Sequence, residues 1–502
     1  MKLIVRDFDV AAMVLGVVMH DDDCVEMGVK EGDRVRVDGV TSHVVIANTS
    51  DSLVKRGEVL MPEELRKKIG VKEGSEVNVV FSPAPESVKS IRKKMDGQKL
   101  SKDEINAIIS DVLASRLSLI ETSAWLTSLY INGMDVDEIA DMTNAMVDTG
   151  DRIEFDRTPV FDFHSIGGVP GNKVTPIVVS IVAAAGLMLP KTSSRAISSA
   201  CGTSDFVETF CKVEMEASEL KKISEEVGGV LAWGGSMNLA PVDDLLIKVE
   251  YPLNINPRAQ MLASIMSKKL AIGATHLLMD IPTGPGTKVK TIEEARAYVR
   301  DFMELGQRLG MTVECAITYG DQPVGSAVGP GLEARECIRI LEGYGHPSSV
   351  IEKACDLAGI ILEMGGIPHG ADEARRILNS GEALKKFREI VAAQGGKPDI
   401  TSDDIHIGKY KAEVVSTKSG YVHSIKNKDI VQIARAVGAP ADKGAGLLVL
   451  KKKGQRVEKG DVLMEIYGDI ESKCQRAKEL AIKLTPIGIE GMLIEKVTRK
   501  IV

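Results

Sequence analysis

The spacing of hydrophobic and polar positions changes along the chain and divides it into parts. The segment Met27–Val37 returns in similar form at Ile69–Val79, and each copy ends in an alternation of apolar and polar residues. This period of two is typical of a half-buried strand. Each copy begins with a short helical stretch. The pattern therefore predicts helix, glycine turn and strand, used twice, in a pseudo-twofold β-barrel over residues 1–84.

A helical spacing of apolar residues begins after the proline-containing linker Ser82–Pro85. Ser101 and Glu104 have the spacing of a capping box, in which each side chain bonds the backbone of the other residue. Apolar residues follow at intervals of three and four. We expect an all-α domain over residues 85–155, with a later contribution from about 241–271.

Strands alternate with helices from about residue 156, and short strands with glycine turns follow from about residue 413. The alternation is typical of an α/β core, which we place at 156–412. The part over 413–502 resembles a barrel-sandwich hybrid, and the N-terminal repeat resembles the double-psi barrel of the N-terminal module of archaeal AAA ATPases. The predicted fold class is α/β, with an N-terminal double-psi-like β-barrel, an all-α subdomain, an α/β core and a C-terminal barrel-sandwich-like α+β region.

Charge and hydropathy exclude two classes of partner. The chain has 63 Lys and Arg against 71 Asp and Glu, a net charge of −8. This balance argues against a protein that coats nucleic acid by bulk electrostatics. The longest nearly apolar run, Ile177–Leu189, has thirteen residues, whereas a membrane span needs about twenty. We expect a buried helix there, no nucleic acid or membrane partner, no signal peptide and a cytoplasmic protein.

The cysteines and histidines do not form metal-binding motifs. The seven cysteines include no C-x-x-C pair, and the eight histidines include no H-x-x-x-H pair. Secreted disulfide frameworks and zinc sites normally show such spacings. We therefore expect no disulfide framework and no metal.

Three segments carry residue types that bind anions. The first, Asp162–Thr175, is a strand end followed by a glycine-rich loop and an apolar helix. Glycines let backbone amides approach an anion, and the helix start adds free N–H groups. The sequence Asn172-Lys173-Val174 differs from the G-K-[ST] of a P-loop, which disfavours a nucleotide triphosphatase. A tight turn without a ligand is the alternative.

The second segment, Lys191–Asp205, places seven hydroxyl residues around Arg195. Hydroxyls and a guanidinium bind phosphate without reacting with it. A merely polar loop is the alternative. Together the first two segments predict that 156–412 is a phosphate- and nucleotide-binding domain.

The third segment comprises Ser264–Leu270 and Met279–Lys288. On a helix, Ser264 and Lys268 share a face, and Lys288 follows a Gly-Pro-Gly turn. Solvated surface lysines are the alternative. No Ser/His/Asp or Cys/His nucleophile pattern is present. The three segments fit group transfer to or from inorganic phosphate, in which a protein positions two anionic reactants.

These motifs resemble those of the thymidine phosphorylases, in order and spacing, over about residues 86–500. Phe163–Val169 is similar to their K-H-S-T-G-G-V-G loop, and Ser193–Asp205 is similar to their S-G-R-x-L-G-H-T-G-G-T-x-D signature. Ser264–Leu270 matches S-I-L-S-K-K-L. The resemblance implies an α domain beside an α/β domain, a dimer, and cleavage of N-glycosidic bonds with phosphate.

Departures from that pattern narrow the resemblance. Phe163 stands where thymidine phosphorylases carry a phosphate-binding lysine, and their pyrimidine-reading arginine has no clear partner around Lys248-Val249-Glu250. With the extra barrel, the chain resembles the archaeal AMP phosphorylase branch. Those pentosyltransferases convert AMP and phosphate to adenine and ribose 1,5-bisphosphate, and they accept CMP and UMP. The resemblance implies no cofactor, with inorganic phosphate as a substrate, and a homodimer that forms larger oligomers through its N- or C-terminal domain.

The same resemblance implies the residues that hold the nucleotide, several of them at its 5′-phosphate. They are Gly168, Ser194, Arg195, Ala196, Ile197, Ser198, Ser199, Thr203, Ser264 and Lys288, with His164, Ser165, Ser193 and Lys268 as additional candidates.

The catalytic position implied by the resemblance is occupied by an unusual residue. The branch uses an aspartate to protonate the leaving base, and spacing puts it at Asn256. An amide donates a hydrogen bond but cannot deliver a proton. We expect Asn256 to be an inactivating substitution; the alternative is that the donor lies elsewhere.

Three other functions remain open at this point. A thymidine or pyrimidine nucleoside phosphorylase would act on nucleosides without a 5′-phosphate. A transferase similar to anthranilate phosphoribosyltransferase would need acidic residues for pyrophosphate-bound magnesium. An adaptor with a decayed site would not need the hydroxyl-rich loop that this chain retains.

Overall fold

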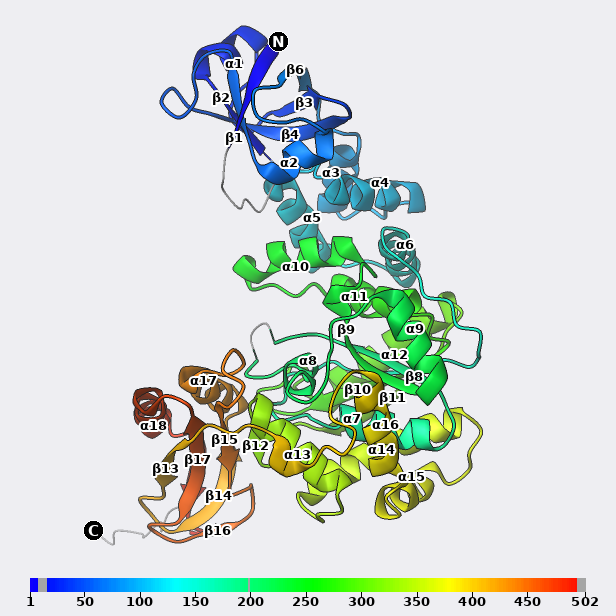
Figure 1. The fold of residues 1–502 in the computed structure, drawn as a ribbon, viewed down its shortest axis with the longest axis vertical. Helices are drawn as coiled ribbons and strands as arrows, with labels where there is room; N and C mark the ends of the chain where they lie inside the picture. The colour runs from blue at the N-terminus through cyan, green and yellow to red at the C-terminus, as the bar shows by residue number, and fades with distance from the viewer. Residues whose placement is uncertain (8–15, 197–198, 494–502) are drawn as a thin grey trace, which may run out of the picture. The chain divides into compact units, whose positions relative to one another are not determined.

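The computed structural model describes residues 1–7, 16–196 and 199–493 (Figure 1). The chain divides into two compact units. The first contains Met1–Asp151 and Ala240–Lys268, and the second contains Arg152–Leu239 and Lys269–Val502. Each unit is described by itself below.

The N-terminal part of the first unit is a closed barrel of six strands in the order β1-β5-β2-β4-β3-β6 (Figure 1). Strands β1 and β5 pair in parallel, as do β2 and β4, while β3 pairs antiparallel with β4 and β6. The barrel that the repeat predicted is therefore confirmed. Its elements are β1 (Lys2–Asp7), β2 (Gly16–Met19), α1 (Asp21–Met27), β3 (Arg34–Asp38), β4 (Ser42–Thr49), β5 (Glu58–Met61), α2 (Glu63–Ile69) and β6 (Glu76–Ser82).

The two copies of the repeat fold alike and pair with each other. Helices α1 and α2 end at Gly28 and Gly70, whose φ angles of 68° and 72° lie in the left-handed region. Glycine enters this region without the steric penalty that a Cβ brings. The strands that follow, β3 and β6, then pair with Val37 opposite Val79, and both valines are fully buried. The sequence repeat is thus the pseudo-symmetry of the barrel core.

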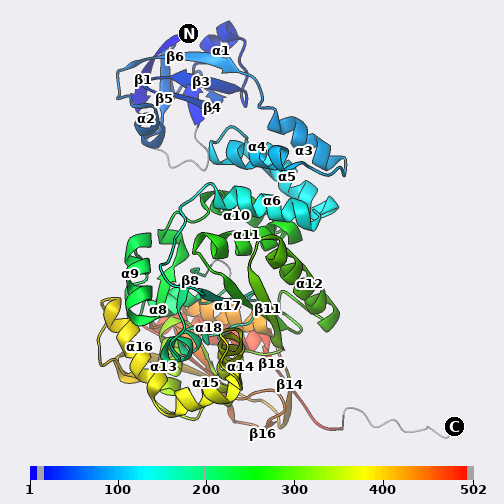
Figure 2. The ribbon, with the colours of Figure 1, turned by 90° about the vertical axis from the view of Figure 1, so that its right-hand side faces the viewer.

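The rest of the first unit is a helical bundle in which α10 packs against α4, α5 and α6 (Figure 2). The predicted capping box is present, because the Glu104 amide donates to Ser101 Oγ at 3.3 Å and the Ser101 amide donates to Glu104 Oε2 at 2.7 Å. The bundle helices are α3 (Ser87–Met95), α4 (Lys102–Leu113), α5 (Leu119–Asn132), α6 (Val136–Val147), α10 (Pro241–Leu253) and α11 (Arg258–Ala271), the last of which ends in the second unit.

The second unit is built on parallel strands. The sheet β11-β10-β7 and the pair β8-β9 are both parallel, and a bridge between Val160 and Met188 joins β7 to β8. Parallel strands bring their carboxyl ends to the same edge of a sheet. The strands are β7 (Phe161–Ser165), β8 (Leu189–Ser193), β9 (Gly229–Trp233), β10 (His276–Thr283) and β11 (Thr312–Tyr319).

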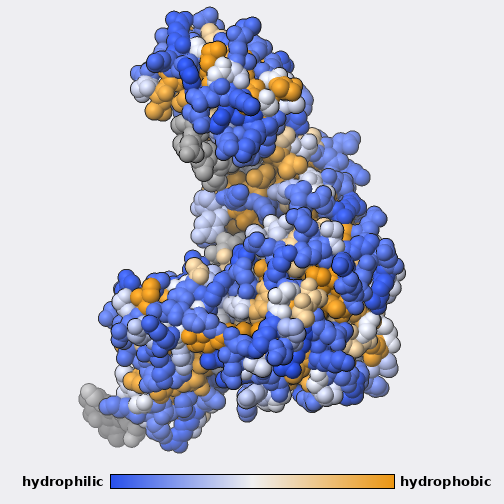
Figure 3. Space-filling model, in the orientation of Figure 1, coloured by the Kyte–Doolittle hydropathy of each residue, from blue (hydrophilic) through white to orange (hydrophobic). Residues whose placement is uncertain are grey.

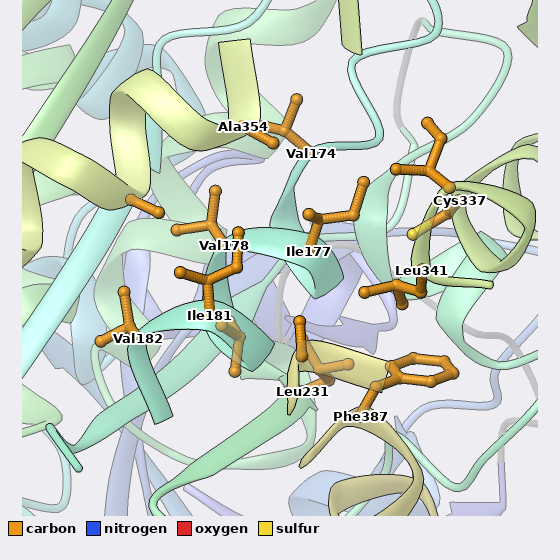
Figure 4. Packing of buried hydrophobic residues seen from close by; sticks show 14 of the residues in the cluster. Val174, Ile177, Val178, Ile181, Val182, Leu231, Cys337, Leu341, Ala354 and Phe387 are labelled. Atoms are coloured by element: carbon orange, nitrogen blue, oxygen red, sulfur yellow. The ribbon is translucent and has the colours of Figure 1, made fainter. Parts of the chain in front are cut away.

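Helices cover these strands, and α7 lies at the centre of the core (Figure 4). The predicted buried helix is present, but it ends at Ala184, and the apolar run continues through Gly186 (φ 85°) into the first residue of β8. The helices are α7 (Thr175–Ala184), α8 (Thr203–Val207), α9 (Ala217–Val227), η1 (Gly234–Ser236), α12 (Ile292–Arg308), α13 (Pro330–Leu341), α14 (Ser348–Met364), α15 (Gly370–Asn379), α16 (Glu382–Ala393) and η2 (Ser402–Asp404).

Up to residue 493, the C-terminal part of the second unit has two small sheets and two helices. The strand order is β12-β15-β17-β13 in one sheet and β16-β14-β18 in the other. Strand β12 comes from the preceding α/β part, so its pairing with β15 joins the two parts. The elements are β12 (Ala327–Val328), β13 (Tyr410–Val415), β14 (Gly420–Ile425), α17 (Asn427–Val437), β15 (Gly446–Val449), β16 (Arg456–Val457), β17 (Val462–Gly468), α18 (Glu471–Leu484) and β18 (Ile487–Glu490).

The described helices include none that is both long and apolar enough to cross a membrane.

The bundle contains a buried ion pair whose removal has a predictable cost. Lys94 Nζ lies 2.9 Å and 3.1 Å from the two carboxylate oxygens of Glu138, and both residues are 3% exposed. We predict that Lys94→Met lowers the free energy of unfolding of this unit by about 3–5 kcal/mol, because the carboxylate stays buried without its cation. Lys94→Met/Glu138→Gln should recover part of the loss.

Denaturant unfolding followed by Trp125 fluorescence measures this effect, since Trp125 is buried in α5 and Trp233 can be changed to Phe to remove the other signal. The matched control is Lys99→Met, whose ion pair with Asp135 is solvent-exposed and is expected to contribute under about 1 kcal/mol. Equal midpoints for Lys94→Met and the parent protein would contradict the prediction.

Candidate functional site

The glycine-rich loop follows β7 and lies against the predicted lysine Lys288. Gly168 has a φ of 90°, and a Cβ placed on it would lie 2.7 Å from the backbone N of Lys288. Only glycine allows this approach. Two predicted residues from distant segments, Gly168 and Lys288, are therefore in contact.

A buried polar network holds the base of this loop. Asp280 on β10 is fully buried and accepts hydrogen bonds from Thr318 Oγ1, from Lys353 Nζ at 2.9 Å and from Asn172 Nδ2 at 3.3 Å. Asn172 also donates to Ser165 Oγ at 3.2 Å. The network fixes the predicted residue Ser165 at the end of β7. Sequence reasoning missed Asp280, although it lies on β10 inside one of the highlighted segments.

The hydroxyl-rich loop is closed by a buried carboxylate. Asp205 Oδ2 accepts hydrogen bonds from the amides of Ala196, at 2.7 Å, and Gly202, at 2.9 Å. A Cβ on Gly202 would lie 2.6 Å from the carbonyl oxygen of Ser194. The loop backbone at Ser194 is therefore in contact with the backbone at Gly202, just before α8 begins at Thr203.

The remaining hydroxyl residues of this loop are distributed around it. Ser193 ends β8, and Ser199 Oγ donates to the carbonyl oxygen of Cys201 at 3.2 Å. Ile197 and Ser198 lie outside the described residues.

The side chain of Arg195 is engaged by carboxylates. Its guanidinium donates to Glu208 at 2.6 Å and 2.8 Å and to Glu214 at 2.9 Å, and it lies 4.7 Å from the centre of the Trp233 ring. The hydrogen bond from Arg195 lowers the pKa of Glu208 to about 2. Since two carboxylates already neutralise the guanidinium, Arg195 stabilises the loop through its side chain. Phosphate binding at this position would fall to the backbone.

The third predicted group forms a cluster between α10 and α11 in the first unit. Asp243 is fully buried and accepts hydrogen bonds from Gln260 Nε2 at 3.0 Å and Ser264 Oγ at 2.7 Å, while Lys268 Nζ lies 2.6 Å from Asp243 Oδ2. Burial disfavours the charge on Lys268, but Asp243 outweighs burial and raises the pKa of this lysine. Ser264 and Lys268 share a helix face, as predicted, and Asp243 is the partner that the sequence did not reveal.

Two residues near the end of α10 bear on proton transfer. Asn256 is exposed in the loop between α10 and α11, with Nδ2 3.8 Å from Met261 Sδ. Glu250 is only 7% exposed, and its Oε1 has no hydrogen-bond partner among the described residues. Burial, and to a smaller extent Asp243, raises the pKa of Glu250 to about 8. Glu250 therefore holds a proton at neutral pH, which the sequence alone did not indicate.

The predicted residues divide between the two units. Ser264, Lys268 and Asn256 belong to the first unit, while His164 and the residues of the two anion loops belong to the second. Within the parts of the chain that the structure describes, no group of three or more His, Cys, Asp or Glu side chains could hold a metal ion.

Comparisons with protein families match nearly the whole chain in segments. Residues 88–150 match the glycosyl transferase family helical bundle domain, and residues 157–384 match the a/b domain of that family. Residues 421–488 match the pyrimidine nucleoside phosphorylase C-terminal domain, and residues 6–93 match a molydopterin dinucleotide binding domain.

Curated relatives match over the full length. The chain is 47% identical over 500 residues to the AMP phosphorylase of Methanococcoides burtonii and 48% identical over 500 residues to that of Thermococcus kodakarensis, with 99% of each chain covered in both cases. Among solved structures, anthranilate phosphoribosyltransferase from Thermus thermophilus matches with a TM-score of 0.53 at 20% identity, over 61% of this chain and 99% of that one. The latter likeness shows the fold alone.

The closure of the hydroxyl-rich loop by Asp205 can be tested without knowledge of the reaction. We predict that Asp205→Ala weakens binding of inorganic phosphate at least about tenfold, because the amides of Ala196 and Gly202 lose a charged acceptor that contributes about 1.5–3 kcal/mol. Isothermal titration calorimetry measures the affinity. The control is Asp404→Ala, which removes a similar capping carboxylate at η2 and should leave phosphate affinity unchanged. Equal phosphate affinity in Asp205→Ala and the parent would contradict the role of the cap.

Proposed function

The chain belongs to the AMP phosphorylase family, and from this premise we propose that it catalyses the phosphorolysis of nucleoside 5′-monophosphates. AMP and inorganic phosphate give adenine and ribose 1,5-bisphosphate, and CMP and UMP are further substrates. The observation that carries the proposal is the identity of 47–49% to AMP phosphorylases over nearly the whole chain. The two anion loops are consistent with it, because the reaction brings together two phosphates.

The proposed reaction exchanges one bond for another at C1′ of the ribose. A phosphate oxygen forms a bond to C1′ while the bond from C1′ to the base nitrogen breaks, and the leaving base gains a proton. We assign Ser165, Ser193 and the hydroxyl-rich loop to the two phosphates. At the same loop, Gly168 allows the backbone to come close to a phosphate, and Lys288 supplies a cation. The reaction needs no cofactor, since phosphate is itself the nucleophile.

We assign the α10–α11 cluster of the first unit to recognition of the base. Ser264 and Lys268 are held by Asp243, so their remaining hydrogen-bonding capacity has a fixed direction. Glu250 lies in the region where thymidine phosphorylases carry their pyrimidine-reading arginine. Replacement of a permanent cation by a protonated carboxyl suits bases with an exocyclic amino group, because the carboxyl oxygen accepts from N–H and its O–H donates to a ring nitrogen.

The proposal has two versions, which differ in the residue that protonates the leaving base. In the first, Asn256 replaces a catalytic aspartate, and the protein is a weakened enzyme. In the second, another acid serves, and Glu250 is the strongest candidate because it is protonated at neutral pH. We favour the first version, since Asn256 lies in the loop where the family places its acid.

The other functions are weaker proposals. A nucleoside phosphorylase would not need the extra phosphate-binding capacity, and the full-length relatives described above are AMP phosphorylases. The likeness to anthranilate phosphoribosyltransferase concerns the fold, at 20% identity. An adaptor would not require Asp205 and Asp280 to hold the loops closed.

We also propose that the protein forms homodimers that assemble further through the N- or C-terminal domain, the former a barrel of the double-psi type. Exposed apolar side chains on α5 support an interface on the bundle, where Figure 3 shows apolar surface: Ile120 is 82% exposed and Ile131 is 72% exposed. Sedimentation of Ile120→Lys/Ile131→Lys tests this surface, and a smaller assembly than that of the parent protein is expected.

One test of this function changes the residue expected to protonate the leaving base. Asn256→Asp should raise the rate of phosphate-dependent adenine release from AMP by about 10²–10⁴-fold, the usual contribution of a general acid. The matched control is Asn254→Asp, two residues away at the C-terminal cap of α10, which should leave the rate unchanged. If Asn256→Asp gains nothing and Glu250→Gln abolishes the activity of the parent, the second version of the proposal holds.

A separate prediction concerns the preference for substrates that carry a 5′-phosphate. In the Asn256→Asp protein, kcat/KM for AMP should exceed that for adenosine by at least about 100-fold, because charged hydrogen bonds contribute about 1.5–3 kcal/mol each. Lys288→Met should lower kcat/KM for AMP and leave that for adenosine nearly unchanged. Faster phosphorolysis of adenosine or thymidine than of AMP would instead assign the protein to the nucleoside phosphorylases.

A further inference from the structure

Three charged side chains are buried together beneath the strand edge that carries the anion loops. Asp162 on β7 is fully buried, while Lys191 on β8 and Lys269 on α11 are 4% and 2% exposed. Lys269 Nζ lies 2.6 Å from Asp162 Oδ2, and Lys191 Nζ lies 3.6 Å from Asp162 Oδ1. The reaction as proposed above uses none of the three.

The cluster holds two bases and a single acid. Asp162 has its shorter contact with Lys269, and the ammonium of Lys191 also donates to the carbonyl oxygen of Thr192. A buried charge without full compensation costs several kcal/mol, which a lysine avoids by releasing its proton. Burial, together with Lys269, lowers the pKa of Lys191 to about 7 despite the opposing effect of Asp162. Lys191 thus shares the carboxylate of Asp162 with Lys269, and the cluster carries one more base than acid.

The place of Lys191 in the sheet points to a further counterion. The Phe161 amide donates to the Met188 carbonyl at 3.0 Å, which sets β7 and β8 in register. Counting from the parallel bridge between Val160 and Met188, Phe163 lies level with Lys191, and Ser165 lies level with Ser193. Two residues of strand span roughly 6.6 Å, which is close to the length of a lysine side chain. The Lys191 ammonium donates to the Thr192 carbonyl, one residue before Ser193.

The lysine that the family resemblance would place on β7 is absent, and Lys191 lies on the neighbouring strand β8. Phe163 stands where the loop motif of thymidine phosphorylases has a lysine, and its side chain is buried in the core. The ammonium of Lys191 lies 6.0 Å from the centre of the Phe163 ring. A cation is therefore present at this level of the sheet, although it comes from the neighbouring strand.

We propose that Lys191 supplies the cation for the anion bound at the carboxyl edge of β7 and β8, and that it takes up a proton as this anion binds. The proposal rests on the proposed function, which places inorganic phosphate at Ser165 and Ser193. The bound dianion provides the counterion that the cluster lacks. Asp162 and Lys269 are the charged groups that face Lys191 from β7 and α11, and β9 places the apolar Leu231 beside it.

The direction of the pH effect follows from the state of Lys191. Above about pH 7 the free protein holds this lysine largely neutral. A nearby dianion favours the charged form and raises its pKa. Anion binding at pH 8 is therefore coupled to uptake of up to one proton. At pH 6 the lysine is already protonated, so binding takes up little.

The test uses sodium sulfate, whose double negative charge does not change between pH 6 and pH 9. Isothermal titration calorimetry at pH 8, in two buffers of different ionisation enthalpy, gives both the affinity and the number of protons taken up. The parent should approach one proton per site. Lys191→Met should take up none and bind sulfate about tenfold more weakly. Lys290→Met, which changes an exposed lysine, should behave like the parent.

Lys191→Arg tests the same role of this side chain if Lys191→Met does not fold. Arginine stays charged at every pH used, so this variant should bind sulfate at pH 8 without proton uptake. Sulfate binding by the parent without proton uptake, or equal uptake by Lys191→Arg, would overturn the role of Lys191.

Failure of the proposed function has a different signature. In that case the parent binds no sulfate, and the Asn256→Asp protein releases no adenine from AMP. An active Asn256→Asp protein whose parent binds sulfate without uptake would overturn only the inference about Lys191.

Discussion

Two buried carboxylates, Asp280 on β10 and Asp205 on α8, hold the loops on which the proposed site depends. Backbone amides bind anions only when they are free of other partners and fixed in direction. In this protein Asp280 fixes Ser165 through Asn172, and Asp205 closes the hydroxyl-rich loop by accepting two of its amides. The loops themselves are rich in glycine and serine and would otherwise be mobile. Their order therefore depends on these two buried acids.

A buried acid also positions side chains on the helices of the first unit. Asp243 joins α10 to α11 and orients Ser264 and Lys268. In each case a buried acid is compensated by several donors, which makes its burial tolerable. The cluster around Asp162 differs because it contains more bases than acids. This imbalance is what distinguishes Lys191 from the structural ion pairs of the protein, such as that of Lys94 with Glu138.

Local patterns in the sequence predicted the fold well where they determine structure locally. The repeat ending at Gly28 and Gly70 predicted the barrel, Ser101 and Glu104 predicted a capped helix, and the apolar run at Ile177 predicted the central helix. The partners of the site residues could not be predicted in this way. Asp280 and Lys353 meet only after the sheet forms, and a guanidinium such as that of Arg195 looks free until its carboxylates are placed. The chemistry of these loops was visible in the sequence, but the groups that hold them were not.

The central claim is that phosphate itself attacks C1′ of a nucleotide. The most direct test incubates AMP and inorganic phosphate with the Asn256→Asp protein and identifies the sugar product by phosphorus NMR and mass spectrometry. The account predicts ribose 1,5-bisphosphate, with adenine released in equal amount and only when phosphate is present. Formation of ribose 5-phosphate, or adenine release without phosphate, would contradict it.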